Sequence, residues 1–366
     1  MDWRKKRKEL INKLPTLLDV LEHLAYGEER WALEKSPLRM AFPNHCQEGC
    51  FELVVMPDGV ARLFPCSLSV NDYYRGQTAY YPDCRPSLLR KGMTESQVFV
   101  ERLKLAEFSV LIQNHPLVKM YPNGFLWKDP VGNVHPVNLC VDAEALAQHY
   151  GIKTDLMDFT VDKWVAAFFA CTDYDARTDT YSAHKSNGED YGVFYMYVDL
   201  NFSPDGNLRL RPVGQQPFPR PGEQAGYVLS MYPGDNLNKK VAQKIKFRHV
   251  DEISELVFNY TNRSNKLFPY DSLQVKAKII KESTCFSLAA FEKAKSKFYP
   301  DVDENVLQDY LKVENITLVS EPIVEYLTDE IDSFNEEWKS LREKEFLSKI
   351  IVRYTYNGPI IENSDK

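Results

Sequence analysis

Residues 73–90 read Tyr-Tyr-Arg-Gly-Gln-Thr-Ala-Tyr-Tyr-Pro-Asp-Cys-Arg-Pro-Ser-Leu-Leu-Arg, and they follow a run that predicts a β-strand. The guanidinium of Arg75 is permanently charged and offers a planar set of donors for a phosphate or a carboxylate. Gly76 beside it allows the backbone to approach a ligand closely or to adopt a turn. This pair indicates a binding site at the end of the strand.

A second informative segment spans residues 146–170. It places several polar residues just before a run, Trp164 to Ala170, that is apolar almost all round. Such a run predicts a deeply buried helix. Its polar residues include Gln148, His149, Asp158 and Thr160.

The two segments resemble the FRG domain, a bacterial family named for its Phe/Tyr-Arg-Gly motif. The resemblance covers roughly residues 50–283. The family's aromatic-Arg-Gly-Gln motif is matched by Tyr74 to Gln77, and its Pro-Ser-Leu-x-Arg motif by Pro86 to Arg90. Its Gln-His-Tyr-Gly-x-x-Thr-x-Leu-x-Asp-aromatic-Thr motif is matched by Gln148 to Thr160. Two later elements of the family are matched by Gln224 to Tyr227 and by Leu267 to Pro269.

We expect an α+β fold: a mixed or antiparallel split sheet with flanking helices, and helical additions at both ends. The 366 residues, 44% of them apolar, fit one main domain with such additions. The expected parts are an N-terminal helical segment at 1–49, an FRG domain at 50–283 and a mostly helical extension at 284–366.

Local signals predict the start and end of several elements. Thr94 and Gln97 predict a capping box for a helix through about residue 112. Asp142 predicts the start of a short helix that stops at Gly151. Two helical segments divided by Pro15 are expected within residues 3–35, and a hairpin is expected from Glu52 to Phe64.

Further along the chain, the apolar runs Tyr191–Val198 and Tyr227–Met231 predict strands. Residues 201–222 are rich in Pro, Gly and Arg and predict a long loop, which is often functional in a compact domain. Ile331 to Leu341 predicts an amphipathic helix, and residues 357–366 predict a loose tail.

The order of these signals also resembles the ADP-ribosyltransferase fold, in the branch whose first strand carries Tyr-Arg-Gly. Val165 to Ala170 follows that branch's Val-Ala-x-x-Phe-Ala helix, and Asp158-Phe159-Thr160 stands where the branch has Ser-Thr-Ser. The resemblance implies NAD as a co-substrate. It implies a site in which Arg75 holds the pyrophosphate or ribose and the backbone of Gly76 contacts the carboxamide. Tyr74 or Tyr150 would stack on the nicotinamide ring, and Thr160 would position a ribose hydroxyl. Gln77 and Gln224 complete the set of cofactor-binding residues.

Loss of nicotinamide from NAD leaves positive charge on the ribose, so the site needs an anion nearby. The resemblance implies that Glu223 fills this role or orients the acceptor. Members of the branch also carry a Glu or Gln two residues before the catalytic Glu, and this sequence has no second acid at that spacing. Asp158 could supply the negative charge instead, and His149, with an ordinary pKa of about 6.5, could act as an acid or base. Alternatively the site binds without catalysis.

Each of these residues also has a structural interpretation. Arg75 could form a buried ion pair with Asp158, since buried charges are normally paired. Asp158 and Thr160 could cap the following helix. His149 could be a hydrogen-bonded structural histidine, and Gln224 and Gly226 could only pack at a strand edge.

Composition excludes several classes of protein. The net charge of −7, from 45 basic and 52 acidic residues, argues against a broadly basic nucleic-acid coat. No apolar run approaches the roughly 18–20 residues that span a bilayer, so we expect no membrane association. Seven scattered cysteines fit reduced thiols in a cytoplasm. We expect no metal site, because the group His45, Cys46, Cys50, Cys66 and Cys84 holds one Cys-x₃-Cys and no second pair.

The leading hypothesis is NAD-dependent ADP-ribosyl transfer or NAD cleavage by a bacterial toxin or phage-defence protein. The acceptor macromolecule, protein or nucleic acid, is unknown. One alternative is an enzyme acting on nucleic acid, with Arg75, His149 and Asp158 as its polar centre. The other is a non-catalytic sensor that binds a nucleotide or a partner protein.

Overall fold

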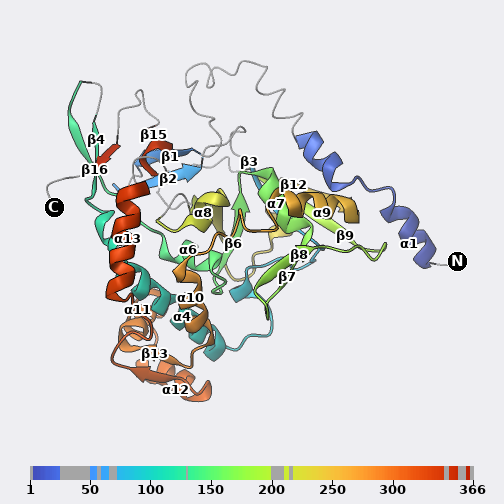
Figure 1. The fold of residues 1–366 in the computed structure, drawn as a ribbon. Coiled ribbons are helices and arrows are strands. Elements are labelled where there is room, and N and C mark those ends of the chain that lie inside the picture. Colours follow the sequence, from blue (N-terminus) through green and yellow to red (C-terminus); the bar gives the residue numbers. More distant parts are fainter. Residues whose placement is uncertain are drawn as a thin grey trace.

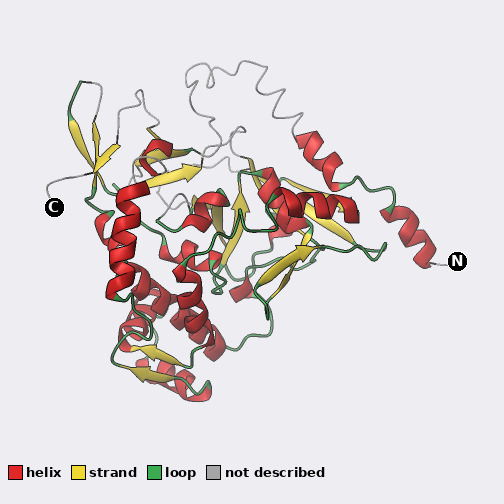
Figure 2. Cartoon of the chain, viewed as in Figure 1, coloured by secondary structure: helices red, strands yellow, loops and turns green. Residues whose placement is uncertain are grey.

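The computed structural model describes residues 3–24, 50–55, 59–65, 72–128, 131–198, 210–213, 217–341, 346–352 and 360–362. They form the expected α+β fold around a central sheet (Figure 1, Figure 2). Helix α1 (Trp3–Ile11) lies at one end of the molecule, and the helices that follow residue 287 gather at the opposite end (Figure 1).

The central sheet has six strands, and all neighbouring strands are antiparallel. β3 and β6 pair at the single position Tyr74–Thr160, so the sheet opens between them into two three-stranded halves. This gap agrees with the expected split sheet. The strands, in sheet order, are β10 (Leu210–Pro212), β11 (Gly226–Ser230), β6 (Leu156–Thr160), β3 (Asp72–Gln77), β9 (Tyr191–Val198) and β12 (Gln243–Arg248).

One face of this sheet is covered by α7 (Lys163–Ala170), α9 (Asp251–Tyr260) and a helix at residues 17–24. As expected, α7 is almost wholly buried. Its N-cap is Asp162, whose carboxylate accepts a hydrogen bond from the Trp164 amide at 2.7 Å. The capping interpretation of Asp158 and Thr160 is therefore wrong, because both residues lie within β6.

Gly76 is where β3 touches α7. A Cβ added to Gly76 would lie 1.9 Å from the Ala166 carbonyl oxygen and 2.6 Å from the Ala170 Cβ. The close approach of strand and helix therefore requires glycine here. Packing thus accounts for a residue that the sequence suggested for ligand contact.

A second core is helical and joins the middle of the chain to residues after 284. The capping box at Thr94 and Gln97 is confirmed, and so is the Asp142 cap. Buried Glu107 accepts hydrogen bonds from the amide and hydroxyl of Ser287 and from the Ile323 amide, which ties the two regions together. The elements are α4 (Glu95–Gln113), α6 (Ala143–His149), α10 (Ser272–Glu282), β13 (Cys285–Ser287), α11 (Leu288–Phe298), α12 (Glu304–Val313) and β14 (Thr317–Val319).

His115 caps α5 (Pro116–Met120) and lies in an aromatic cluster that includes Phe334 of α13 (Thr328–Leu341). Its Nδ1 accepts a hydrogen bond from the Leu117 amide at 3.2 Å, so the ring is neutral in the folded chain. Burial lowers the pKa of His115 from 6.5 to about 4.

The free energy of unfolding should therefore fall as the pH falls from about 6.5 to about 4, because only the unfolded chain takes up a proton at His115. The loss should be on the order of 3 kcal/mol. We expect the free energy of unfolding, measured with denaturant at several pH values from 7.5 to 4, to fall less steeply with pH for His115→Asn than for wild type. Asparagine does not titrate in this range, and it is also a favoured helix cap. Equal slopes for the two proteins would contradict a neutral buried His115.

Two smaller sheets contain strands from the C-terminal end. The expected hairpin is confirmed as β1 (Phe51–Val55) and β2 (Ala61–Pro65), and β15 (Ile350–Val352) adds parallel to β1. β16 (Ile360–Glu362) pairs with β4 (Phe125–Lys128), which pairs with β5 (Val134–Val137). The expectation of a loose tail is wrong at Ile360–Glu362, where the β-branched pair Ile360-Ile361 favours a strand.

The expected loop at 201–222 is also wrong in part. Its described residues include β10 and the helix α8 (Pro219–Glu223), which begins with proline at its first position. The second helical segment expected near the N-terminus is described only at residues 17–24. The remaining elements are β7 (Thr172–Asp175), β8 (Thr180–Ala183) and the 3₁₀ turns Ser87–Leu89, Leu237–Lys239 and Leu347–Lys349. None of the helices described has the length and apolar character to cross a membrane.

Candidate functional site

A cavity of about 1020 Å³ lies at the gap between β3 and β6. Small-molecule sites commonly enclose about 300–1000 Å³, so this cavity can hold a dinucleotide-sized ligand. Its walls include consecutive residues of β3 and β6, the end of α6, the hairpin β7–β8, α8 and the turn after α9.

Arg75 bridges the gap between the two halves of the sheet. Its Nη1 donates a hydrogen bond to the Asp158 carbonyl oxygen at 3.0 Å, where a strand-to-strand bond would otherwise lie. Side chains alternate along a strand, so Arg75 leaves β3 on the face opposite to Tyr74, whereas Asp158 shares the face of Thr160. The expected ion pair with the Asp158 carboxylate is therefore absent among the described residues. The buried Nε of Arg75 has no partner there.

The Asp158 carboxylate has a single hydrogen-bond partner among the described residues. Its Oδ2 accepts a hydrogen bond from Gln148 Nε2 at 3.1 Å, and Gln148 is held in turn by the Thr154 hydroxyl. The other oxygen, Oδ1, is buried and has no partner in the described part of the chain. Asp158 thus keeps one carboxylate oxygen available at the cavity wall.

His149 and Gln224 form a buried pair. Gln224 Nε2 donates to the Leu267 carbonyl oxygen at 2.9 Å, so its Oε1 must accept the 2.8 Å hydrogen bond from His149 Nδ1. The lone pair of a neutral His149 then lies on Nε2, close to Gly226, where an added Cβ would sit 3.1 Å away. Burial, assisted by Arg220, lowers the pKa of His149 although Asp158 opposes the shift. His149 is neutral near pH 7 and enclosed, which favours a positioning role.

Thr160 and Ala225 determine the backbone conformation of the segment that leads into β11. The Thr160 hydroxyl donates to the Gln224 carbonyl oxygen at 2.8 Å and accepts from the Asp162 amide at 3.0 Å. Ala225 has a φ of 44°, in the left-handed region that costs a non-glycine residue about 1–3 kcal/mol. The Gln224 side chain thus joins His149 to the Leu267 carbonyl oxygen, and Gly226 of β11 pairs with Thr160.

Arg220 of α8 was missed by sequence reasoning, because it lies in the segment expected to be a loop. It is only 6% exposed, and its ring neighbours are Tyr150 and Phe268. The nearest carboxylate oxygen is that of Asp271 at 3.9 Å, and this oxygen already accepts the Tyr150 hydroxyl at 2.6 Å. A buried guanidinium with so distant a counterion is costly unless a ligand supplies an anion.

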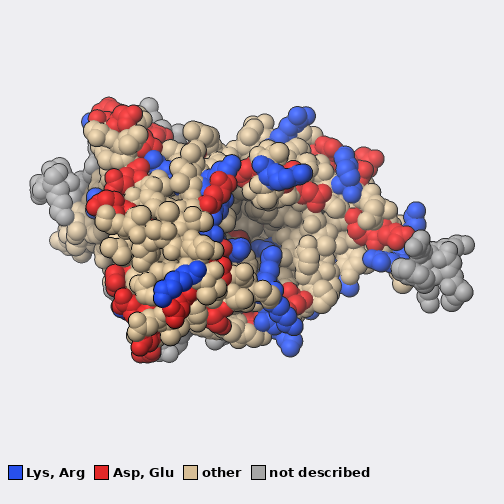
Figure 3. Space-filling model, turned by 90° about the horizontal axis from the view of Figure 1, so that it is seen from below, with Lys and Arg blue, Asp and Glu red and all other residues tan. Residues whose placement is uncertain are grey.

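The cavity lining is cationic overall. Figure 3 shows a hollow in this face of the molecule with Lys and Arg side chains along its border. Burial lowers the pKa of Lys281, and Arg220 lowers it further, against the opposing charge of Asp179. The cationic residues of the lining are Arg75, Arg90, Arg220, Arg263 and Lys281, and the acidic ones are Asp158, Asp173 and Asp179.

The aromatic residues expected to stack on a base are poorly placed. Tyr74 and Tyr150 are 1% and 3% exposed, and Tyr150 is already covered by the Arg220 guanidinium. Tyr174, which is 48% exposed, also lines the cavity. Burial and a hydrogen bond to Asp179 raise the pKa of Tyr174 to about 12, so its ring is neutral. Tyr174 is a better stacking candidate than either expected residue.

The turn after α9 carries unusual backbone strain at the cavity. Asn262, Arg263 and Ser264 have φ values of 49°, 51° and 75°, and Arg263 and Ser264 line the cavity. Three successive left-handed residues without glycine cost about 1–3 kcal/mol each and are typical of functional sites.

The structure brings together all but one of the expected site residues. Glu223 is exposed at the end of α8 and is not part of the cavity lining. The residues that do line it are Tyr74, Arg75, Gly76, Gln77, His149, Tyr150, Asp158, Thr160 and Gln224.

The cysteines considered for zinc are only partly described. Cys84 is a buried free thiol whose Sγ lies 3.6 Å from Gln77 Nε2, and Cys50 is half-buried. His45, Cys46 and Cys66 lie outside the described residues.

An α+β fold with a split sheet and a cation-lined cavity thus surrounds the Tyr-Arg-Gly-Gln strand. Residues 71–179 match the family model of the FRG domain, so the chain contains an FRG domain. The match includes Arg75, His149 and Asp158 but ends before Arg220 and Gln224. No curated protein and no solved structure matches the chain.

Proposed function

We propose that the cavity binds NAD and supports cleavage of its nicotinamide–ribose bond, with water or a macromolecule as the acceptor. The observation that carries this proposal is the pair of arginines, Arg75 and Arg220, in the cavity lining: Arg75 donates to a backbone carbonyl oxygen, and among the described residues the carboxylate closest to Arg220, that of Asp271, is 3.9 Å away. NAD offers a pyrophosphate that such guanidinium groups recognise.

The volume and charge of the cavity support the same ligand. About 1020 Å³ is enough for a dinucleotide, and the lining holds two more cationic than acidic side chains. The enclosed position of Arg220 strengthens its interaction with an anion, because fewer water molecules compete there.

Asp158 is the acid best placed to act in the reaction. When the C1′–nitrogen bond breaks, both electrons leave with neutral nicotinamide and positive charge develops on the ribose. The unpaired Oδ1 of Asp158 can stabilise that charge. A nucleophile then bonds to C1′ and loses its proton to solvent or to a base.

The position of Glu223 favours a second candidate, a sensor that binds the nucleotide without cleaving it. Glu223 is exposed and outside the cavity, so the lining lacks the glutamate expected from the resemblance to ADP-ribosyltransferases. The toxin or phage-defence setting stays a prediction under both candidates.

The test is NAD binding by calorimetry together with nicotinamide release, for wild type and Arg75→Gln. We expect Arg75→Gln to bind NAD about 10- to 100-fold more weakly, the effect of losing a charge-assisted hydrogen bond. Release without cell lysate indicates hydrolysis, and release only with lysate indicates transfer to an acceptor.

The matched control is Arg7→Gln, which removes an exposed arginine of α1 and should bind as wild type does. Binding without release would support the sensor. Absence of NAD binding by the folded wild-type protein would refute the proposal.

A further inference from the structure

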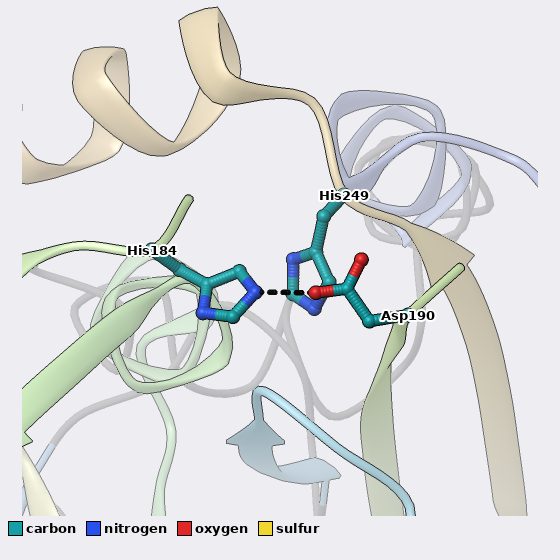
Figure 4. A group of neighbouring side chains, drawn as sticks. All are labelled: His184, Asp190 and His249. Atoms are coloured by element: carbon teal, nitrogen blue, oxygen red, sulfur yellow. Dashed lines mark hydrogen bonds and ion pairs between the residues drawn. The ribbon is translucent and has the colours of Figure 1, made fainter. Parts of the chain in front are cut away.

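Three side chains outside the cavity converge at the ends of three strands (Figure 4). His184 follows β8, Asp190 precedes β9 and His249 follows β12. One potential ligand atom from each lies within 4.8 Å of the others. Among the described residues this is the group that has the composition of a metal site.

His184 is oriented as metal-binding histidines usually are. Its Nε2 points to Asp190 Oδ2 at 2.8 Å, and its Nδ1 lies 3.0 and 2.9 Å from the two carboxylate oxygens of Asp173. A histidine that binds metal through one nitrogen normally donates its other N–H to a carboxylate or carbonyl. Asp173 provides that acceptor and leaves Nε2 for the metal.

His249 has the same arrangement with a backbone acceptor. Its Nε2 lies 2.8 Å from the Thr78 carbonyl oxygen, which can only accept, so Nε2 carries the proton. The lone pair of neutral His249 is therefore on Nδ1. This atom is buried without a partner in the described structure, in a residue that is 7% exposed.

Asp190 completes the group. Its Oδ1 accepts a hydrogen bond from the Ser186 hydroxyl at 2.8 Å, which leaves Oδ2 as the oxygen near the histidines. A protonated His184 between Asp173 and Asp190 would make a simple ion-pair network. That network gives no partner to the His249 lone pair, whereas a metal ion does.

We propose that His184, Asp190 and His249 bind a divalent transition-metal ion, for which Zn²⁺ is the best match to two imidazole nitrogens and one carboxylate oxygen. Donors around tetrahedral zinc lie about 3.4 Å apart. On binding, His184 Nε2 and Asp190 Oδ2, which are 2.8 Å apart, must therefore separate slightly, and the ligand atoms that lie up to 4.8 Å apart must move closer together. The fourth position is left for water.

The ion would join the ends of β8, β9 and β12. Thr78 and Asp173, which hold the two histidines, both line the cavity. The expected role is therefore structural: the metal fixes this edge of the cavity without entering it. This inference does not depend on the identity of the cavity ligand.

The test is titration of the chelator-treated full chain with ZnCl₂ by calorimetry. We expect one equivalent to bind with a Kd below about 1 µM. Asp190→Asn and His184→Gln should weaken binding by about 100-fold or more, and Asp173→Asn by about 10- to 100-fold. The matched control His23→Gln, at an exposed histidine of residues 17–24, should bind as wild type does.

Cobalt provides a second measurement that needs no variant. Co²⁺ bound by the wild-type chain should give visible absorption bands unlike those of the aqueous ion, and one equivalent of Zn²⁺ should remove them. Retention of these bands and of zinc affinity in folded His184→Gln would overturn the proposal. So would a wild-type chain that takes up less than one equivalent of Zn²⁺ and leaves the Co²⁺ spectrum unchanged.

Discussion

Gly76→Ala is expected to lower the free energy of unfolding by about 3 kcal/mol or more, or to prevent folding. The added Cβ would overlap the Ala166 carbonyl oxygen and press on the Ala170 Cβ. Neither atom is the tip of a flexible side chain, so β3 and α7 must move apart. That movement would open the apolar core beneath α7, where Tyr74 and Phe194 pack.

Denaturant unfolding measured by far-UV circular dichroism gives the free energy directly. The control is Gly222→Ala, because a Cβ there meets only the Phe51 ring at 3.7 Å and alanine favours the helix. We expect Gly222→Ala to stay within about 1 kcal/mol of wild type. A Gly76→Ala protein of wild-type stability would show that α7 does not rest on β3.

Asp158→Asn is expected to reduce nicotinamide release by about 100- to 1000-fold. Asparagine has nearly the same shape and can still accept the hydrogen bond from Gln148, so the change removes mainly the negative charge. NAD affinity should change far less, because the charge is needed chiefly when the ribose becomes cationic.

Initial rates of nicotinamide release and NAD calorimetry separate these two effects. The matched control is Asp309→Asn, an exposed aspartate of α12 that pairs with Lys312. We also expect Glu223→Gln to cost less activity than Asp158→Asn, since Glu223 lies outside the cavity lining. An active Asp158→Asn enzyme with wild-type turnover would remove Asp158 from the mechanism.

Local signals were the most predictable part of the fold. The capping box at Thr94 and Gln97 and the Asp142 cap depend on residues three or four positions apart, so they can be read directly. Tyr191–Val198 is confirmed as a strand with the predicted bounds, because its apolar run is continuous.

The site was predictable where its residues lie in β3, α6 and β6. Arg220 and Lys281 could not be found in this way, because their role depends on burial in the folded chain, which brings them to the cavity from segments far apart in the sequence. The same holds for His184, Asp190 and His249, which only the pairing of β9 with β12 and the β7–β8 hairpin bring together.

The parallel pairing of β1 with β15 has a consequence for synthesis of the chain. Ribosomes add about 5–20 residues per second, so roughly 300 residues take about 15 to 60 s to translate. During that time the edge of the β1–β2 hairpin that Ile350–Val352 later covers is open on the nascent chain. An open edge can pair with other chains, so the cell's chaperones should matter most for this protein before its last residues emerge.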